Sequence, residues 1–176
     1  MNVLSNLKVS STNNKRSLEK LVRAVTLSEG QFSVILVRCN DIRLRHKIMK
    51  QLGKYSSVKI KTIKLSPSIT TLYTAIKTTL GEERPEALIV LGLESVVAID
   101  QVLTATNLMR DEFRKQFSFP LVLWVSDDIL GKVIRLAPDF KSWAANAILF
   151  DTLNNLDGNK SPLESHSKQA RMRFSH

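Results

Sequence analysis

Two acidic residues follow short apolar runs, at positions from which a carboxylate could act on a bound ligand. Glu94 comes three residues after the run at residues 87–91, and Asp127 comes two residues after the run at residues 121–125. Glu94 could order a magnesium ion or a water molecule, and Asp127 could act as a sensor or a general base. Alternatively, each acid belongs to the start of a following helix, where the helix dipole favours negative charge.

The turn that follows the first apolar run, residues 32–37, lacks the residues of a phosphate-binding loop. Such a loop has the pattern G-x-x-x-x-G-K-[ST], whose glycines let backbone N–H groups surround the phosphates while the lysine neutralises charge. This chain reads RCNDIRLR over residues 38–45, and Asp41 puts negative charge where a phosphate would lie. The candidate contacts for any nucleotide are Asn40, Arg43 and Arg45. Hydrolysis by the standard mechanism is not expected, because phosphoryl transfer depends on positioning and on charge stabilisation.

Cysteine and histidine do not suggest a second catalytic site. Cys39 and His46 lie on one segment, but no nucleophile–histidine–acid arrangement can be built around them from the sequence. We expect Cys39 to fill apolar space at the end of a buried strand. No histidine lies at a zinc-ligand spacing from Cys39, so no metal site is predicted. A single cysteine cannot form an internal disulfide, which fits a reducing cytoplasm.

A cluster of basic residues is the most unusual feature of the chain. At 100° per residue, Arg43, Lys47, Lys50 and Lys54 fall on one stripe of a predicted helix, and Lys59 and Lys61 follow on a predicted edge strand. This pattern has two interpretations: a solvated face, or a docking surface for nucleic acid or an acidic protein. Few aromatic residues interleave with these lysines, so contact with a phosphate backbone is favoured over stacking on bases.

Composition indicates a single globular domain with a strong positive charge. The 176 residues are 43% hydrophobic, and the net charge is +10 with a pI near 9.9. Such a charge attracts polyanions without specifying which. No apolar run is long enough to cross a membrane, and the N-terminus has no signal-peptide pattern. We therefore expect a cytoplasmic protein with no membrane partner.

Helix and strand patterns alternate along the chain and predict a parallel sheet. Strands are expected at residues 32–37, 58–64, 87–91, 121–125 and 147–150. Helices are expected from an N-cap at Ser17 to about residue 29, from Asn40 or Asp41 to a stop at Gly53, and at residues 70–80, 96–115 and 127–136. This order predicts a doubly wound, five-stranded α/β domain of three layers, with ligands bound at the carboxyl ends of the strands.

Domain boundaries follow from composition. Residues 1–16 are expected to be a flexible N-terminal segment, residues 17–152 the α/β domain, and residues 153–176 a disordered basic tail.

Four segments resemble a known family. They are VILVRCNDIRLRHKIM, ALIVLGLES, FPLVLWVSDDIL and RLAPDFKSW, which together span about residues 18–150. They resemble the AAA-like, STAND-type P-loop NTPase domain at the N-terminus of tetratricopeptide-repeat proteins of photosynthetic bacteria. The resemblance implies a P-loop fold with the Walker-B position at Glu94 and the sensor position after the fourth strand, near Asp127. Because the phosphate loop is replaced, it also implies a degenerate member of that family.

The leading hypothesis is therefore a non-catalytic pseudo-NTPase domain that serves as a protein-interaction or regulatory module. No cofactor is expected, although ATP with magnesium stays open. One alternative is a nucleic-acid-binding protein that uses the basic helix at residues 41–54. Another is a weakly ATP-binding, STAND-type ATPase that uses Glu94.

Overall fold

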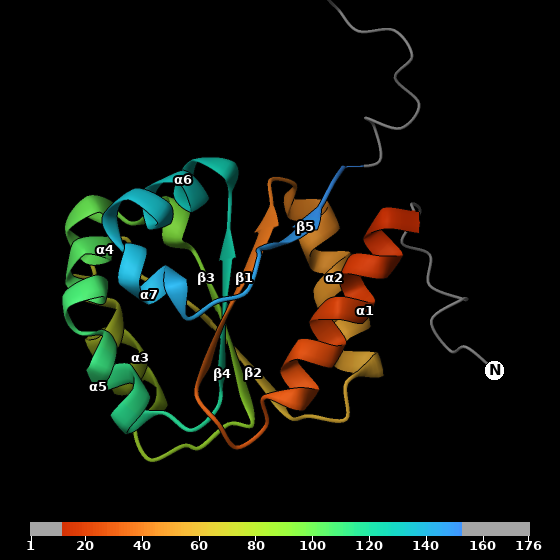
Figure 1. Ribbon diagram of the computed structural model, residues 1–176, viewed down its shortest axis with the longest axis horizontal. Helices are drawn as coiled ribbons and strands as arrows, with labels where there is room; N and C mark the ends of the chain where they lie inside the picture. Colours follow the sequence, from red (N-terminus) through yellow and green to blue (C-terminus); the bar gives the residue numbers. More distant parts are fainter. Residues whose placement is uncertain (1–11, 153–176) are drawn as a thin grey trace, which may run out of the picture.

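Five parallel strands form the central sheet of this protein, in the order β2-β3-β4-β1-β5. The computed structural model describes residues 12–152, and Figure 1 shows the sheet between two layers of helices. The strands are β1 (Ser33–Cys39), β2 (Ile60–Lys64), β3 (Ala87–Leu91), β4 (Pro120–Val125) and β5 (Ile148–Phe150). The predicted doubly wound, three-layer α/β fold is confirmed, and β2 lies at an edge of the sheet as predicted.

Helices cover both faces of the sheet. On one face lie α1 (Thr12–Leu27) and α2 (Ile42–Tyr55); on the other lie α3 (Leu72–Leu80), α4 (Ile99–Leu108), α5 (Arg110–Gln116), α6 (Asp127–Leu136) and α7 (Pro138–Ser142), with a short 3₁₀ helix, η2 (Leu93–Ser95), after β3. Each face has its own hydrophobic core. All residues of β3 and β4 are buried, which explains their uninterrupted apolar sequences.

Helix caps were predicted well where a short polar side chain follows a strand. Asp41 is the N-cap of α2, and Ser126 is the N-cap of α6, where its hydroxyl accepts a hydrogen bond from the N–H of Ile129 at 3.3 Å. Gly81 ends α3 with a positive φ of 53°, a backbone conformation that glycine adopts without strain. Local side-chain chemistry therefore fixes these boundaries.

Several predicted helix boundaries were wrong. The helices predicted from residues 70 and 96 begin at Leu72 and Ile99. The helix after β1 continues through Gly53 to Tyr55, because Leu52 and Tyr55 pack into the core on either side of this exposed glycine. The helix predicted at residues 96–115 is two helices that meet at Met109. There the guanidinium of Arg110 donates to the Asn107 carbonyl at 2.7 Å and satisfies a helix-end acceptor.

The first helix begins at Thr12, so Ser17 is not its N-cap and residues 12–16 are helical rather than part of a flexible segment. The reason is a tertiary contact with the edge strand β5. The side-chain amide of Asn14 donates to the Asp151 carbonyl at 2.8 Å and accepts from the Asp151 N–H at 3.0 Å. The Ser17 hydroxyl donates to the Leu149 carbonyl at 2.6 Å. Residues 1–11 and 153–176, including the predicted basic tail, lie outside the described residues.

These contacts generate a stability prediction. Asn14 is fully buried, so replacing it with alanine leaves the backbone N–H and carbonyl of Asp151 without the part-buried hydrogen bonds to this side chain. We expect Asn14→Ala to lower the free energy of unfolding by about 1–3 kcal/mol in urea denaturation. The matched control is Asn13→Ala, which alters an exposed neighbour in the same helix and should change stability by less than about 0.5 kcal/mol. Equal effects of the two substitutions would contradict this role for Asn14.

Candidate functional site

The carboxyl ends of β1, β3 and β4 lie at the same end of the sheet and surround a small cavity. Its volume is about 140 Å³. Pockets that hold drug-sized ligands start at about 300 Å³, so this cavity is small for a nucleotide. The charged or polar side chains in its lining are those of Cys39, Asn40, Asp41, Arg45, Glu94, Trp124 and Ser126.

Asn40 joins the turn after β1 to the start of α6. Its side-chain amide donates to Asp127 Oδ2 at 2.7 Å, and its carbonyl oxygen accepts from the Asp127 N–H at 2.8 Å. Both polar atoms of the Asn40 side chain are therefore engaged. As a predicted nucleotide contact, Asn40 lies at the expected cavity but is bound to Asp127.

Asp127 is held from a second direction by Arg38. Arg38 Nε lies 3.3 Å from Asp127 Oδ1, and Arg38 Nη1 lies 3.1 Å from Asp151 Oδ1. The Arg38 side chain is only 17% exposed, which favours a defined geometry over a mobile surface pair. Each oxygen of the predicted sensor or base thus accepts from a different partner, and the arginine also ties it to the residue that follows β5.

Asp41 occupies the N-terminus of α2 with its own carboxylate. Its Oδ1 accepts from the N–H of Arg43 at 2.8 Å and from the N–H of Leu44 at 3.4 Å. These N–H groups and the helix dipole are what a helix N-terminus offers to a bound anion. In this protein a side chain already satisfies them.

Glu94 pairs with Arg45 across the cavity. Arg45 Nη1 lies 3.3 Å from Glu94 Oε1, and the arginine side chain is 13% exposed. Glu94 lies in the first turn of the short 3₁₀ helix η2, as the alternative interpretation placed it, but no side-chain cap hydrogen bond is made at the start of η2 or of α4. The structure therefore places Glu94 at the carboxyl ends of the strands, as predicted, where Arg45 neutralises its charge.

Arg43 differs from the other two predicted nucleotide contacts. It lies in the first turn of α2, is exposed, and is not among the residues that line the cavity. The structure thus brings Asn40 and Arg45 together but leaves Arg43 on the outer surface of the helix.

The exposed residues Arg43, Lys47, Lys50 and Lys54 form what we call the basic face of α2. The opposite side of the helix carries Leu44, Ile48 and Leu52, all buried as the periodicity predicts. Within residues 12–152, none of the four basic side chains has an ion-pair partner. Their charge is therefore not answered by the described part of the chain.

The two predicted basic residues of the edge strand have different surroundings. Lys59 is exposed and has no ion pair with any described residue, as is also true of Lys64 at the end of β2. Lys61 is half-buried, and its ammonium pairs with Glu83. Lys61 is thus less available to a polyanion than the sequence suggested, because its charge is already paired. The sequence did not reveal this ion pair, since Glu83 lies 22 residues away along the chain.

Sequence reasoning missed Arg38 and Asp151 as members of this site. Arg38 interrupts an otherwise apolar strand, and a charged residue in a buried strand signals a partner. Asp151 follows the last strand directly, so its position at the shared carboxyl edge was a usable signal. Neither signal identifies which acid pairs with which arginine.

Cys39 is buried, as predicted, and lies where β1 ends. Burial raises the pKa of its thiol above the ordinary value of 9.0, and the nearby Asp41 carboxylate acts in the same direction. The thiol donates to the Asp41 carbonyl at 3.4 Å. A raised pKa disfavours the thiolate, so Cys39 is not set up as a nucleophile.

Comparison with known proteins gave no match to a family model, to a curated protein or to a solved structure. Across residues 12–152 there is no cluster of three or more histidine, cysteine, aspartate or glutamate side chains placed to hold a metal ion. In the same part of the chain, no helix has the length and apolar character needed to span a bilayer.

The environment of Cys39 generates a second prediction. In the folded protein, iodoacetamide at pH 8 should label Cys39 at least about a hundredfold more slowly than in urea, because labelling requires local opening. Since the raised pKa keeps the thiol protonated in the folded state, the free energy of unfolding should fall as the pH rises above 9.0, where the unfolded chain loses this proton first. Cys39→Ala should remove that part of the pH dependence. Equally fast labelling with and without urea would refute this account.

Proposed function

We propose that this protein is a non-catalytic domain of P-loop NTPase-like fold that serves as a protein-interaction or regulatory module. One observation carries the proposal: the Asp41 carboxylate binds the N–H groups at the start of α2. A triphosphate placed there would have to displace that carboxylate or lie against its negative charge. The position reserved for phosphate in a P-loop protein is thus filled from within the chain.

The other residues at the site support the same proposal. Magnesium binding by Glu94 would compete with its ion pair to Arg45, and proton transfer by Asp127 would compete with Asn40 and Arg38. These contacts connect the carboxyl ends of β1, β3 and β4, so the network holds these strand ends together. A weak ATPase would need to dismantle several of these contacts in each cycle.

The resemblance to the STAND-type domain remains part of this proposal. What supports it is the arrangement of the three positions that the resemblance singles out. The turn after β1, Glu94 after β3 and the segment after β4 all line one cavity. That is the arrangement expected of a phosphate loop, a Walker-B acid and a sensor strand in a parallel sheet.

Nucleotide titration tests the central claim. We expect isothermal titration with ATP and magnesium to give no saturable heat at millimolar concentrations. Asp41→Asn retains a capping side chain but removes the charge, so it should bind pyrophosphate at least about fivefold more tightly than wild type. The matched control, Asp128→Asn, neutralises an exposed acid in the first turn of α6 and should not. Micromolar ATP binding with turnover by the wild-type protein would overturn the proposal.

A second candidate function is nucleic-acid binding through the basic face of α2. The observation that favours it is the exposure of four basic side chains without an ion-pair partner among residues 12–152. Phosphates spaced along a backbone would supply the missing counter-charges. The same surface suits an acidic protein segment, so salt dependence and mutation must distinguish a direct phosphate contact.

Salt titration with duplex DNA tests this second candidate. Binding measured by fluorescence anisotropy should weaken steeply between about 50 and 200 mM salt. The double variant Lys47→Ala/Lys50→Ala should reduce the slope of log K against log salt by about 2, since each lost phosphate contact removes about 0.9. The matched control is Lys77→Ala/Lys115→Ala, which removes exposed lysines from helices on the opposite face. Affinity independent of salt would eliminate the nucleic-acid candidate.

A further inference from the structure

The two edges of the sheet differ in how their backbone is protected. At β5, Asn14 and Ser17 of α1 bind the outward-facing groups of Leu149 and Asp151. At the other edge, β2 pairs with β3 and has no strand beside it on its other side within residues 12–152. Among the described residues, side chains therefore cover one edge of the sheet, and the other edge is open to pairing.

The register of β2 shows which of its residues face the open edge. The Lys59 carbonyl accepts from the Ala87 N–H at 3.2 Å, and the Leu65 N–H donates to the Leu91 carbonyl at 2.9 Å, so odd-numbered residues bond to β3. Backbone directions alternate along a strand, and the N–H and C=O groups of Ile60, Thr62 and Lys64 therefore point away from β3. Thr62 and Lys64 are exposed.

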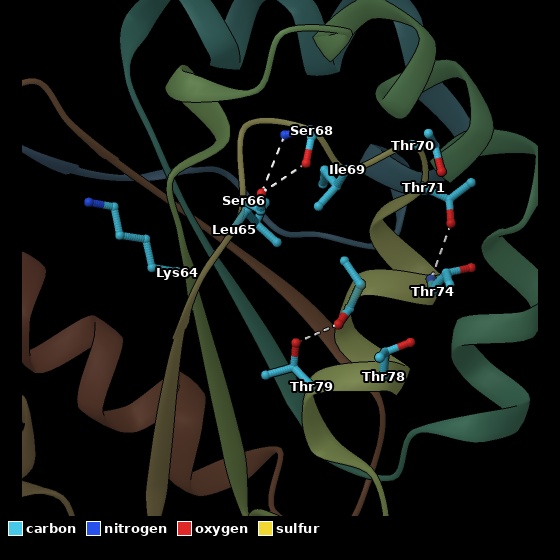
Figure 2. Close-up of a pocket in the computed structure, with 11 residues that line it drawn as sticks. Lys64, Leu65, Ser66, Ser68, Ile69, Thr70, Thr71, Thr74, Thr78 and Thr79 are labelled. Atoms are coloured by element: carbon cyan, nitrogen blue, oxygen red, sulfur yellow. Dashed lines mark hydrogen bonds between the residues drawn. The ribbon is translucent and has the colours of Figure 1, made fainter.

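A groove of about 360 Å³ lies beside the end of β2, between that strand, the connection that follows it and α3. Figure 2 shows its lining, in which the hydroxyl side chains of serine and threonine predominate, among them Ser66, Thr70, Thr74 and Thr78. In the same view the Lys64 side chain points away from the threonines of α3. A strand added beside β2 would thus meet a groove on one face and a lysine on the other.

Charge indicates what kind of strand fits this edge. Lys59 directly precedes β2 and Lys64 ends it; both are exposed, and neither has an ion pair with a described residue. Pairing with a second copy through β2 would bring these lysines close to their counterparts, which is unfavourable. An acidic segment would neutralise them instead.

We propose that the open edge of β2 is a strand-addition site for an extended, acidic segment of a partner protein. The segment pairs with Ile60, Thr62 and Lys64 through its backbone. Alternate side chains enter the hydroxyl-lined groove beside α3, and the others carry acids toward Lys64. This inference rests on the proposed function as an interaction module and adds the docking edge, the binding mode and the partner chemistry.

A proline substitution separates strand addition from simple charge attraction. In Thr62→Pro, the ring replaces an N–H that faces the open edge, so pairing with β3 is kept while a docked strand loses a donor and meets the ring. The control Thr62→Val keeps the N–H and a β-branched shape. The probe is a fluorescein-labelled peptide of alternating glutamate and valine, (Glu-Val)₄, compared with (Lys-Val)₄.

We expect (Glu-Val)₄ to bind wild type and Thr62→Val alike and to bind Thr62→Pro about tenfold or more weakly. Binding should also slow amide hydrogen exchange in residues 58–66, and Lys59→Glu/Lys64→Glu should reverse the preference between the two peptides. Melting temperature monitors the folding of each variant, and the charge-reversal variant provides a test that does not depend on proline.

Several outcomes would overturn the inference: no binding of (Glu-Val)₄, equal binding by Thr62→Pro, or slowed exchange in α2 instead of β2. Self-association through β2 in sedimentation would replace the acidic segment with a second copy and would also overturn it. No nucleotide is present in these assays. Their failure is therefore separate from a failure of the ATP titration, which tests the closed phosphate position.

Discussion

The arrangement at the carboxyl ends of the strands depends on one contact, the hydrogen bonding of the Asp41 carboxylate to the N-terminus of α2. A helix that starts at the end of a central strand must find partners for its first N–H groups, because these point into a confined region. A bound anion or a side chain can provide them. Here the side chain does, at 2.8 Å from the N–H of Arg43. With this negative charge in place, the neighbouring Arg38 and Arg45 pair with Asp127 and Glu94.

The position of β1 between two other strands explains why the turn that follows it affects the carboxyl ends of several strands. β1 lies between β4 and β5, so polar side chains at its exit reach the residues that follow both strands. Asn40 and Arg38 meet at Asp127, and Arg38 extends to Asp151. On the other side of the cavity, Arg45 in the second turn of α2 reaches Glu94 after β3. One turn in the sequence thereby links the ends of four strands, which makes the site a structural junction.

The sequence was informative where a structure depends on neighbouring residues. Apolar runs predicted β3 without error because the strand is buried on both faces, and Ser126 marked the start of α6. The sequence could not reveal contacts between distant positions. Asn14 is separated by 137 residues from Asp151, and Arg45 by 49 residues from Glu94. These separations explain why α1 was predicted to begin too late and why the pairing of Glu94 with Arg45 was not predicted.

The surplus of positive charge also becomes clearer once partners are assigned. The net charge of +10 counts every lysine and arginine equally, but the structure separates those that pair with acids from those that do not. Arg38, Arg45 and Lys61 are at most half-exposed and pair with acids, so they contribute to the architecture of the sheet edge and of β2. The basic face of α2 and the ends of β2 have no such partners within residues 12–152. Like charges that lie near one another on a helix are mildly destabilising when nothing answers them. These unpaired charges on one side of the sheet do not stabilise the isolated chain, and they are the feature that supports the association with a negatively charged partner that we propose.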